Sequence, residues 1–204
     1  MAALIIDRDL EAELIAERRR TGADRYDEVW DGVYVMAALA DDEHQELVNG
    51  LAAVLTVAVD WVRLGKVRPG VNVSDRDSDW KKNYRCPDVV VFLNETKAIN
   101  RGSHWYGGPE FAVEVVSPSD RSRKKLRFYA KVGTRELLIV DRHPWALELY
   151  RLHDGELKSV GRSTVDDAAT LASEVVPLSF RLVAGDERPR IEVVHMTGDG
   201  RWMV

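Results

Sequence analysis

The sequence predicts an α/β (α+β) domain in which a mixed β-sheet is flanked by helices. Two observations lead to this class. Apolar residues recur at three- and four-residue spacing over 42–62, which indicates a long helix with one buried face. Three apolar, strand-like segments then follow at 67–73, 88–93 and 110–116. A helix with one apolar face buries it against such a sheet.

The chain has 204 residues, 45% of them hydrophobic, which is enough for one domain with a sizeable core. We expect a charged N-terminal helix within residues 1–25, a main domain over 26–183, and a tail over 184–204 that packs on the same domain as edge strands. No apolar run reaches the roughly 18 residues that cross a bilayer. Acidic residues follow the start too early for a secretory signal. We therefore expect a cytoplasmic protein without a membrane partner.

The remaining elements are predicted in order along the chain. A helix over 7–20 precedes two short strands within 26–39, joined at Asp31-Gly32, a pair that tolerates the positive φ of a tight hairpin. Asp41 or Asp42 caps the long helix, and Gly65 marks its end. Further expectations are loops over 74–85 and 100–109, a helix over 119–132, a buried strand over 136–140, an exposed hairpin of 146–152 and 156–160, and one or two edge strands after 180.

Charge and cysteine content narrow the functional classes. The formal net charge is −5, so general attraction to nucleic acid is unfavourable and any contact with phosphates must be local. The one cysteine, Cys86, excludes a disulfide within the chain and a cysteine-based zinc site. We interpret it as a small apolar residue.

Glu114 stands in the middle of an apolar strand. Side chains alternate between the faces of a strand, so Glu114 shares a face with Ala112 and Val116. A buried carboxylate there without a partner would be strongly unfavourable, so Glu114 needs a cation or a proton. The alternative is a solvated face, or a pair with an arginine from the next helix.

Asp88 begins an equally apolar strand, directly after Pro87. Two acids on neighbouring strands, with a backbone carbonyl such as that of Val115, provide the oxygen ligands that Mg²⁺ prefers. A bound ion lowers the pKa of a water ligand and neutralises charge on a phosphate. Lys124 and Lys125 follow, where a lysine could orient the attacking water or balance that charge. The alternatives are a turn-capping role for Asp88 and a solvated helix face for the lysines.

Five segments in order carry a resemblance to a known family: EHQELVNGL, RCPDVVVF, FAVEVVSPSD, KLRFYAKVGTRELLIVD and ALELYRL. Together they resemble the Uma-two family of "putative restriction endonucleases", a branch of the PD-(D/E)xK nuclease superfamily that is common in bacteria. The resemblance covers roughly residues 26–182. It implies a restriction-endonuclease-like core and a Mg²⁺-dependent endonuclease that hydrolyses phosphodiester bonds in DNA, with Mn²⁺ as the alternative ion.

The resemblance also implies roles for individual residues. Asp88 and Glu114 are similar to the two metal-binding acids, and Lys125, four residues before Tyr129, is similar to the catalytic lysine, with Lys124 as the reserve candidate. Val116 occupies the place where the superfamily's lysine usually stands. His44 matches a histidine at the start of the family's long helix, either as a hydrogen-bonded core residue or as an outer-shell or direct metal contact.

Local cations would contact phosphates despite the acidic total. The predicted contacts are Arg121, Arg123 and Lys124, with Arg127, Lys81, Lys82 and Arg85 as further candidates. The aromatic residues of the two loops, Trp80, Tyr84, Trp105 and Tyr106, either stack on bases or anchor the loops.

A homodimer is expected because cleavage of a duplex needs two sites and the family often pairs. Two other interpretations stay open. One is a non-catalytic binding or assembly module built on a nuclease fold. The other is an unrelated α/β protein with surface ion pairs, which requires Asp88 and Glu114 to lie far apart.

Overall fold

The structure, a computed structural model, describes residues 8–37, 39–117 and 121–204. Within these ranges it contains three α-helices, α1 (Arg8–Thr21), α2 (Asp42–Leu55) and α3 (Leu126–Val132). A π-helical turn, η1 (Thr56–Asp60), extends α2, and a 3-10 turn, η3 (Ser122–Lys125), leads into α3. The expected helix start at 119 lies outside the described residues. No helix in the described ranges is both long and apolar enough to span a bilayer.

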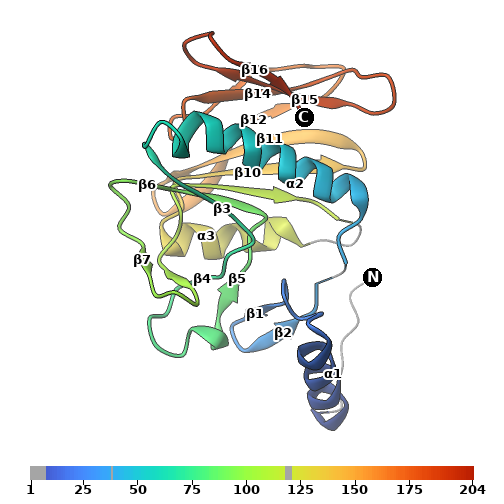
Figure 1. Cartoon of the computed structure of the whole chain (residues 1–204), viewed down its shortest axis with the longest axis vertical. Helices are drawn as coiled ribbons and strands as arrows, with labels where there is room; N and C mark the ends of the chain where they lie inside the picture. The colour runs from blue at the N-terminus through green and yellow to red at the C-terminus, as the bar shows by residue number, and fades with distance from the viewer. Residues whose placement is uncertain (1–7, 38, 118–120) are drawn as a thin grey trace.

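A six-stranded mixed sheet forms the centre of the molecule (Figure 1). Its strands, in the order β12-β11-β10-β9-β6-β3, are β3 (Gly65–Pro69), β6 (Val89–Leu93), β9 (Phe111–Val115), β10 (Glu136–Arg142), β11 (Trp145–His153) and β12 (Glu156–Ser163). β9 and β10 run parallel, and the other neighbours run antiparallel. The predicted fold class is confirmed. The expectation of an exposed 146–160 hairpin is wrong for its first strand, because β11 is an inner strand with Ala146, Leu147 and Leu149 buried.

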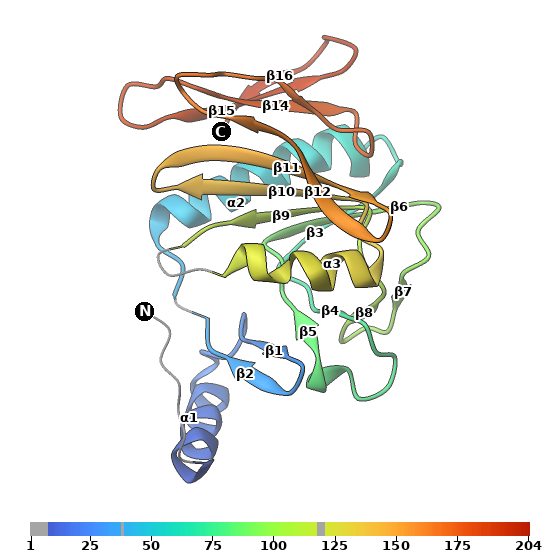
Figure 2. The ribbon, with the colours of Figure 1, turned by 180° about the vertical axis from the view of Figure 1, so that it is seen from behind.

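The two faces of this sheet are covered by different elements. Phe111, Val113 and Val115 of β9 belong to a core shared with α2 and the C-terminal strands, and the ring of Phe111 stacks on that of Phe180 with centroids 5.8 Å apart. Ala112 faces the opposite way, into a second core that contains Phe128 and Tyr129 of α3. Figure 2 shows α3 in front, below β9, and α2 behind strands β10 and β11. The alternation predicted for β9 is therefore present, and it directs Glu114 toward α3.

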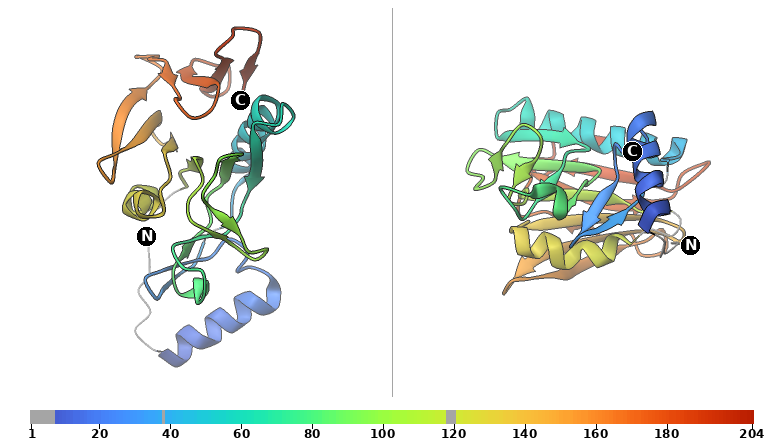
Figure 3. Two further views of the ribbon diagram at one scale, coloured as in Figure 1. Left: turned by 90° about the vertical axis from the view of Figure 1, so that its left-hand side faces the viewer. Right: turned by 90° about the horizontal axis from the view of Figure 1, so that it is seen from below.

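A second, smaller sheet lies beside α3, on the side of α1 (Figure 3). Its strands, in the order β2-β1-β5-β4-β8-β7, are β1 (Glu28–Trp30), β2 (Val33–Val35), β4 (Val73–Ser74), β5 (Tyr84–Arg85), β7 (Ile99–Asn100) and β8 (Trp105–Tyr106). The predicted hairpin turn is present, with positive φ at Asp31 and Gly32. The two segments predicted as loops instead contribute β5 and β8, with a 3-10 turn, η2 (Trp80–Lys82), between β4 and β5. Gly65 is part of β3, where a Cβ would collide with the Phe92 carbonyl, and does not end the helix directly.

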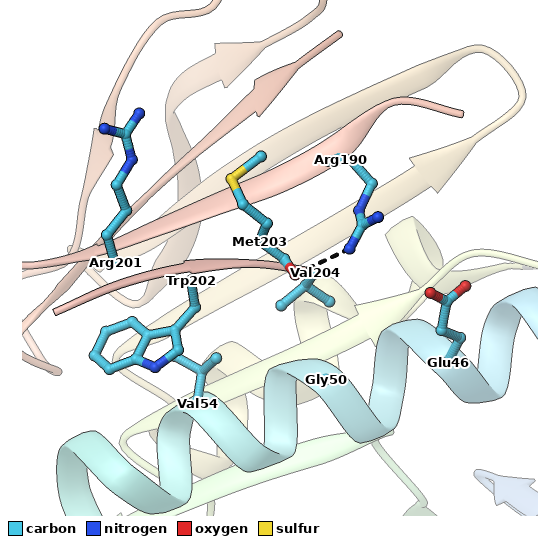
Figure 4. Close-up of a pocket in the computed structure, with 8 residues that line it drawn as sticks. All are labelled: Glu46, Gly50, Val54, Arg190, Arg201, Trp202, Met203 and Val204. Atoms are coloured by element: carbon cyan, nitrogen blue, oxygen red, sulfur yellow. Dashed lines mark hydrogen bonds between the residues drawn. The ribbon is translucent and has the colours of Figure 1, made fainter. Parts of the chain in front are cut away.

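The C-terminal residues form a third sheet of four strands. They are β13 (Leu171–Ala172), β14 (Leu178–Val183), β15 (Arg190–His195) and β16 (Arg201–Met203), paired in sequence order. β14 and β15 pair across the boundary that we placed at residue 183. Of the two strands after that boundary, β15 is an inner strand and β16 is an edge strand. A pocket of about 420 Å³ lies where β16 meets α2 and is lined by Gly50, Val54, Trp202 and Val204 among others (Figure 4).

Candidate active site

Asp88 lies where β6 begins and β9 ends. Val89 pairs with Val113 in the antiparallel ladder, which brings Asp88 to the level of Glu114. One Asp88 oxygen, Oδ2, accepts a hydrogen bond of 2.7 Å from the Val115 N–H, and the side chain keeps 21% exposure. The interpretation that requires Asp88 and Glu114 to lie far apart is therefore wrong.

His44 contacts Asp88 from the first turn of α2. The Asp41 side chain caps this helix by accepting the His44 N–H at 2.8 Å, and His44 Nε2 lies 3.4 Å from Asp88 Oδ1. Burial lowers the pKa of His44, but the hydrogen bond and charge of Asp88 outweigh burial and leave that pKa raised. Its Nδ1 is buried and has no hydrogen-bond partner among the described residues. His44 thus contacts the Asp88 carboxylate. A direct contact of His44 with a metal stays a prediction.

Glu114 is 2% exposed and pairs with Lys125. Lys125 Nζ lies 3.0 Å and 2.9 Å from the two Glu114 oxygens, and the Tyr129 hydroxyl donates to Glu114 Oε1. Lys125 and Tyr129 are four residues apart, so one helical turn directs both toward the strand. The alternatives of a solvated face or an arginine partner for Glu114 are wrong.

The environment of Glu114 disfavours its charged form. Burial raises the pKa of Glu114 to about 8, against the opposing effect of Lys125. The negative charges of Asp88 and Glu28 act in the same direction as burial. The buried acid therefore retains affinity for a proton or for another cation near neutral pH.

Glu28, on β1, is a further acid in this cluster that the sequence did not single out. Its Oε1 lies 3.0 Å from Lys125 Nζ and accepts the Cys86 N–H at 2.9 Å, while Oε2 accepts the Trp30 Nε1–H at 2.6 Å. The side chain is 7% exposed. One signal was available: Glu28 shares a strand face with Trp30, where an acid is unusual if that face is buried.

The donor set fits a hard divalent cation by its chemistry. Two carboxylates, those of Glu28 and Glu114, contact the Lys125 ammonium, and the charge of a third, Asp88, acts on Glu114. Acidic groups therefore outnumber the one ammonium group in this cluster. No three His, Cys, Asp or Glu side chains within the described ranges form a ready-made metal site. Mg²⁺ keeps several waters and often takes only one or two carboxylates from the protein. Asp88 and Glu114, with the Val115 carbonyl, are the residues that would hold it.

The predicted phosphate contacts differ in how available they are. Arg121 and Lys124 are exposed. Arg123 instead pairs with Asp141 and Glu148, which neutralise its charge. Arg85 is 4% exposed, so its expected contact with phosphate is not compatible with the structure.

The loop aromatics pack on one another and on the core. Trp80 stacks on His104 with centroids 4.9 Å apart and meets Tyr84 edge-on at 5.2 Å. Trp105 stacks on Phe92 at 3.6 Å. These contacts favour the anchoring alternative for three of the four aromatics, while Tyr106 is 37% exposed. Cys86 is buried, and burial raises the pKa of its thiol, as expected of a small apolar residue.

A mixed sheet flanked by helices, with two acids and a lysine at one end, defines the class of restriction-endonuclease-like proteins. The chain belongs to the Uma2 (Uma-two) family, described as "Putative restriction endonuclease", whose profile matches residues 13–184. The predicted resemblance is confirmed. Membership in this family supports a nuclease role.

A solved structure supports the same fold. A "putative nuclease belonging to DUF820" from Anabaena variabilis aligns with a TM-score of 0.56 and 16% sequence identity, covering 72% of this chain and 80% of that chain. At this identity the likeness shows the fold alone. No curated protein matches the sequence.

Proposed function

We propose that the protein is a Mg²⁺-dependent endonuclease that hydrolyses phosphodiester bonds in DNA, with Mn²⁺ able to replace Mg²⁺. The observation that carries the proposal is the contact of Glu114 with Lys125 next to Asp88. A strand, a strand entry and a helical turn each contribute one ionisable group to this place. A surface ion pair would not need three buried or half-buried groups from separate segments.

Each residue has a proposed role. Asp88 and Glu114, with the Val115 carbonyl, would hold the ion, which when bound would supply positive charge to the phosphate and favour deprotonation of water. His44 fixes the orientation of Asp88 through its contact with Oδ1. Lys125 orients the attacking water or stabilises negative charge on the phosphate. Arg121 and Lys124 contact flanking phosphates, and the chain acts as a homodimer because two strands must be cut.

The test combines metal binding with DNA nicking. Calorimetry with Mg²⁺ and Mn²⁺, then nicking of a supercoiled plasmid, would compare the wild type with Asp88→Asn and Glu114→Gln, which keep the side-chain shapes. Glu156→Gln, on an exposed position of β12, is the matched control. We expect the wild type and the control to bind and nick, and both site variants to stay folded and do neither. If the wild type neither binds an ion nor cuts DNA, the proposal is wrong, and the protein is a non-catalytic module on a nuclease fold.

Sedimentation velocity tests the proposed dimer. A single species of twice the chain mass is expected at micromolar concentration. A monomer that still linearises plasmid in one binding event would contradict the dimer.

A further inference from the structure

Glu28 is a buried acid that the proposed chemistry does not use. We propose that Glu28 is the positioning residue of the site, which holds the Lys125 ammonium in place between the first hairpin and β9. This inference rests on the proposed function for the importance of Lys125, but the contact that carries it is independent of that function.

The Glu28 carboxylate is fixed from three directions. The Cys86 N–H and the Trp30 indole N–H donate to its two oxygens, and Lys125 Nζ contacts Oε1 at 3.0 Å. Rotation of the carboxylate would break at least one of these contacts in a buried place, which costs more than in water. Glu28 is therefore a preorganised acceptor for the ammonium group.

Lys125 depends on such an acceptor because of where it stands in the chain. Lys125 belongs to η3, a single 3-10 turn, and extends a long side chain with many rotamers. Glu114 contacts the ammonium from one strand and Glu28 contacts it from another. Two acceptors on separate strands define its position better than Glu114 alone.

The hairpin that carries Glu28 is itself anchored. Arg85 lies between the rings of Trp30 and Phe128, at 4.7 Å and 4.3 Å from their centroids, and donates to the Val29 carbonyl at 2.8 Å. Asn83 Oδ1 accepts the Asp31 N–H at 2.9 Å. Held in this way, β1 acts as a rigid support for Glu28. This explains a buried arginine that makes no contact with phosphate.

Glu28 also links Lys125 to the proposed metal-binding segment. Cys86, whose N–H it accepts, stands two residues before Asp88. A single carboxylate thus contacts both the lysine and the chain that leads into Asp88. A displacement of Glu28 would move Lys125 relative to the two acids.

The test compares Glu28→Gln with the matched control Glu110→Gln, which alters another buried acid that accepts a backbone N–H, at the opposite end of β9. The first readout is the acetylation rate of Lys125 by mass spectrometry, with exposed Lys124 as the internal reference. We expect Lys125 to become several-fold more reactive in Glu28→Gln and to stay protected in Glu110→Gln.

The second readout is plasmid nicking with measured kcat and KM. For Glu28→Gln we expect kcat to fall about 10- to 100-fold, the scale of a misplaced catalytic group, with KM for DNA and calorimetric Mg²⁺ affinity nearly unchanged. An unchanged Lys125 reactivity overturns the inference. A loss of activity that only follows a loss of Mg²⁺ affinity also overturns it, because Glu28 would then act at the metal. If the wild type does not nick DNA but Lys125 is deprotected in Glu28→Gln, the positioning stands and the proposed function fails.

Discussion

Glu114 shows how one strand accommodates an acid among apolar neighbours. Without partners, a carboxylate with 2% exposure would be strongly unfavourable. Lys125 offers an ammonium to both oxygens, and Tyr129 donates a hydroxyl to one of them. Because Tyr129 is itself fully buried, its hydroxyl and the carboxylate depend on each other.

This dependence predicts an unequal effect for two tyrosine substitutions. Tyr129→Phe leaves a buried acceptor with one donor fewer, and we expect the free energy of unfolding to fall by about 1–3 kcal/mol. Tyr150→Phe removes a comparable bond to Glu148 that is partly exposed, and we expect about 1 kcal/mol or less. Urea unfolding of both variants, with unchanged m values, measures the difference. Equal losses of unfolding free energy in the two variants would mean that burial does not strengthen the hydrogen bond from Tyr129 to Glu114.

The sequence predicted some of these residues and not others for physical reasons. Glu114 could be found because an acid in an apolar strand needs a partner. Lys124 and Lys125 were candidates because they open the next helix, and the family resemblance implied Lys125 through its spacing to Tyr129. Glu28 could not be assigned to the cluster, because it meets Lys125 across 97 residues of chain (125 minus 28). Arg85 was wrongly predicted to contact phosphate for the same reason, because only the fold reveals that the rings of Trp30 and Phe128 lie on either side of it.

At the scale of elements, the start of α2 joins the site to the sheet. Asp41 was one of two predicted caps, and it is the observed one. Its carboxylate also pairs with Arg142 of β10, whose side chain is 2% exposed. The cap therefore determines both where the helix begins and how it lies on the strand that follows β9 in the sheet.

Two substitutions of Asp41 separate these contributions. Asp41→Asn keeps a capping oxygen but loses the charge opposite Arg142, whereas Asp41→Ala loses both. We expect Asp41→Ala to be less stable than Asp41→Asn by about 0.5–2 kcal/mol, the usual worth of a cap. Thermal unfolding at neutral pH measures the difference, and equal stabilities would exclude a capping role.

The same pair predicts a pH dependence. The hydrogen bond from Arg142, and then that from the His44 N–H, lower the pKa of Asp41 below its ordinary value of 3.8. The folded state therefore favours the carboxylate, and this stability is present above pH 3.8 and lost as the pH falls through the lower pKa of the folded protein. The advantage of the wild type over Asp41→Asn should shrink in that range. A constant difference down to the acid limit would contradict the assignment.

Gly50 lies where α2 meets the C-terminal sheet. A Cβ at Gly50 would lie 2.6 Å from Val204 Cγ1, so Gly50→Ala sets a helix-propensity gain of about 1 kcal/mol against crowding that costs about 1–3 kcal/mol. We expect Gly50→Ala to be less stable than the wild type, and we expect the added Val204→Ala to restore stability beyond simple additivity. A double-mutant cycle from urea unfolding measures this coupling. Additive effects would show that the two residues do not contact.

Elements that repeat an apolar pattern over many residues were predictable, and so was a turn with diagnostic residue types. The helix α2 repeats its apolar stripe over several turns, and the Asp31-Gly32 pair is typical of a tight hairpin turn. By contrast, β4, β5, β7 and β8 have two residues each, which is too short to show an alternation. Their pairing with distant strands, such as Val73 with Trp105, decides that they are strands.

At the scale of the whole molecule, bound metal should raise stability if the proposed site exists. A ligand that binds only the folded state stabilises it by about 2.7 kcal/mol at a concentration of 100 Kd. For a chain of this size, each kcal/mol corresponds to a Tm increase of about 2–4 °C. We expect Mg²⁺ to raise the Tm of the wild type relative to EDTA and to leave Asp88→Asn unchanged. The same rise in both proteins would place the ion elsewhere.

The arrangement of three sheets could not be predicted from local patterns. The strands after residue 170 alternate apolar and polar residues like any exposed hairpin. Their local sequence does not determine whether they pair with one another or with the central sheet. Their position depends on apolar contacts such as that between Phe180 and Phe111. For this reason the tail was expected as edge strands, whereas the central sheet and its covering helix were predicted correctly.

The shared core of α2 and the C-terminal sheet has a consequence for synthesis on the ribosome. Leu47 and Leu51 emerge early, yet Phe180, Ile191 and Val193, which complete the same core, emerge more than 120 residues later. At about 5–20 residues per second, the nascent chain presents an unfinished apolar surface for several seconds or longer. Stable folding must therefore wait until nearly all of this chain has left the exit tunnel.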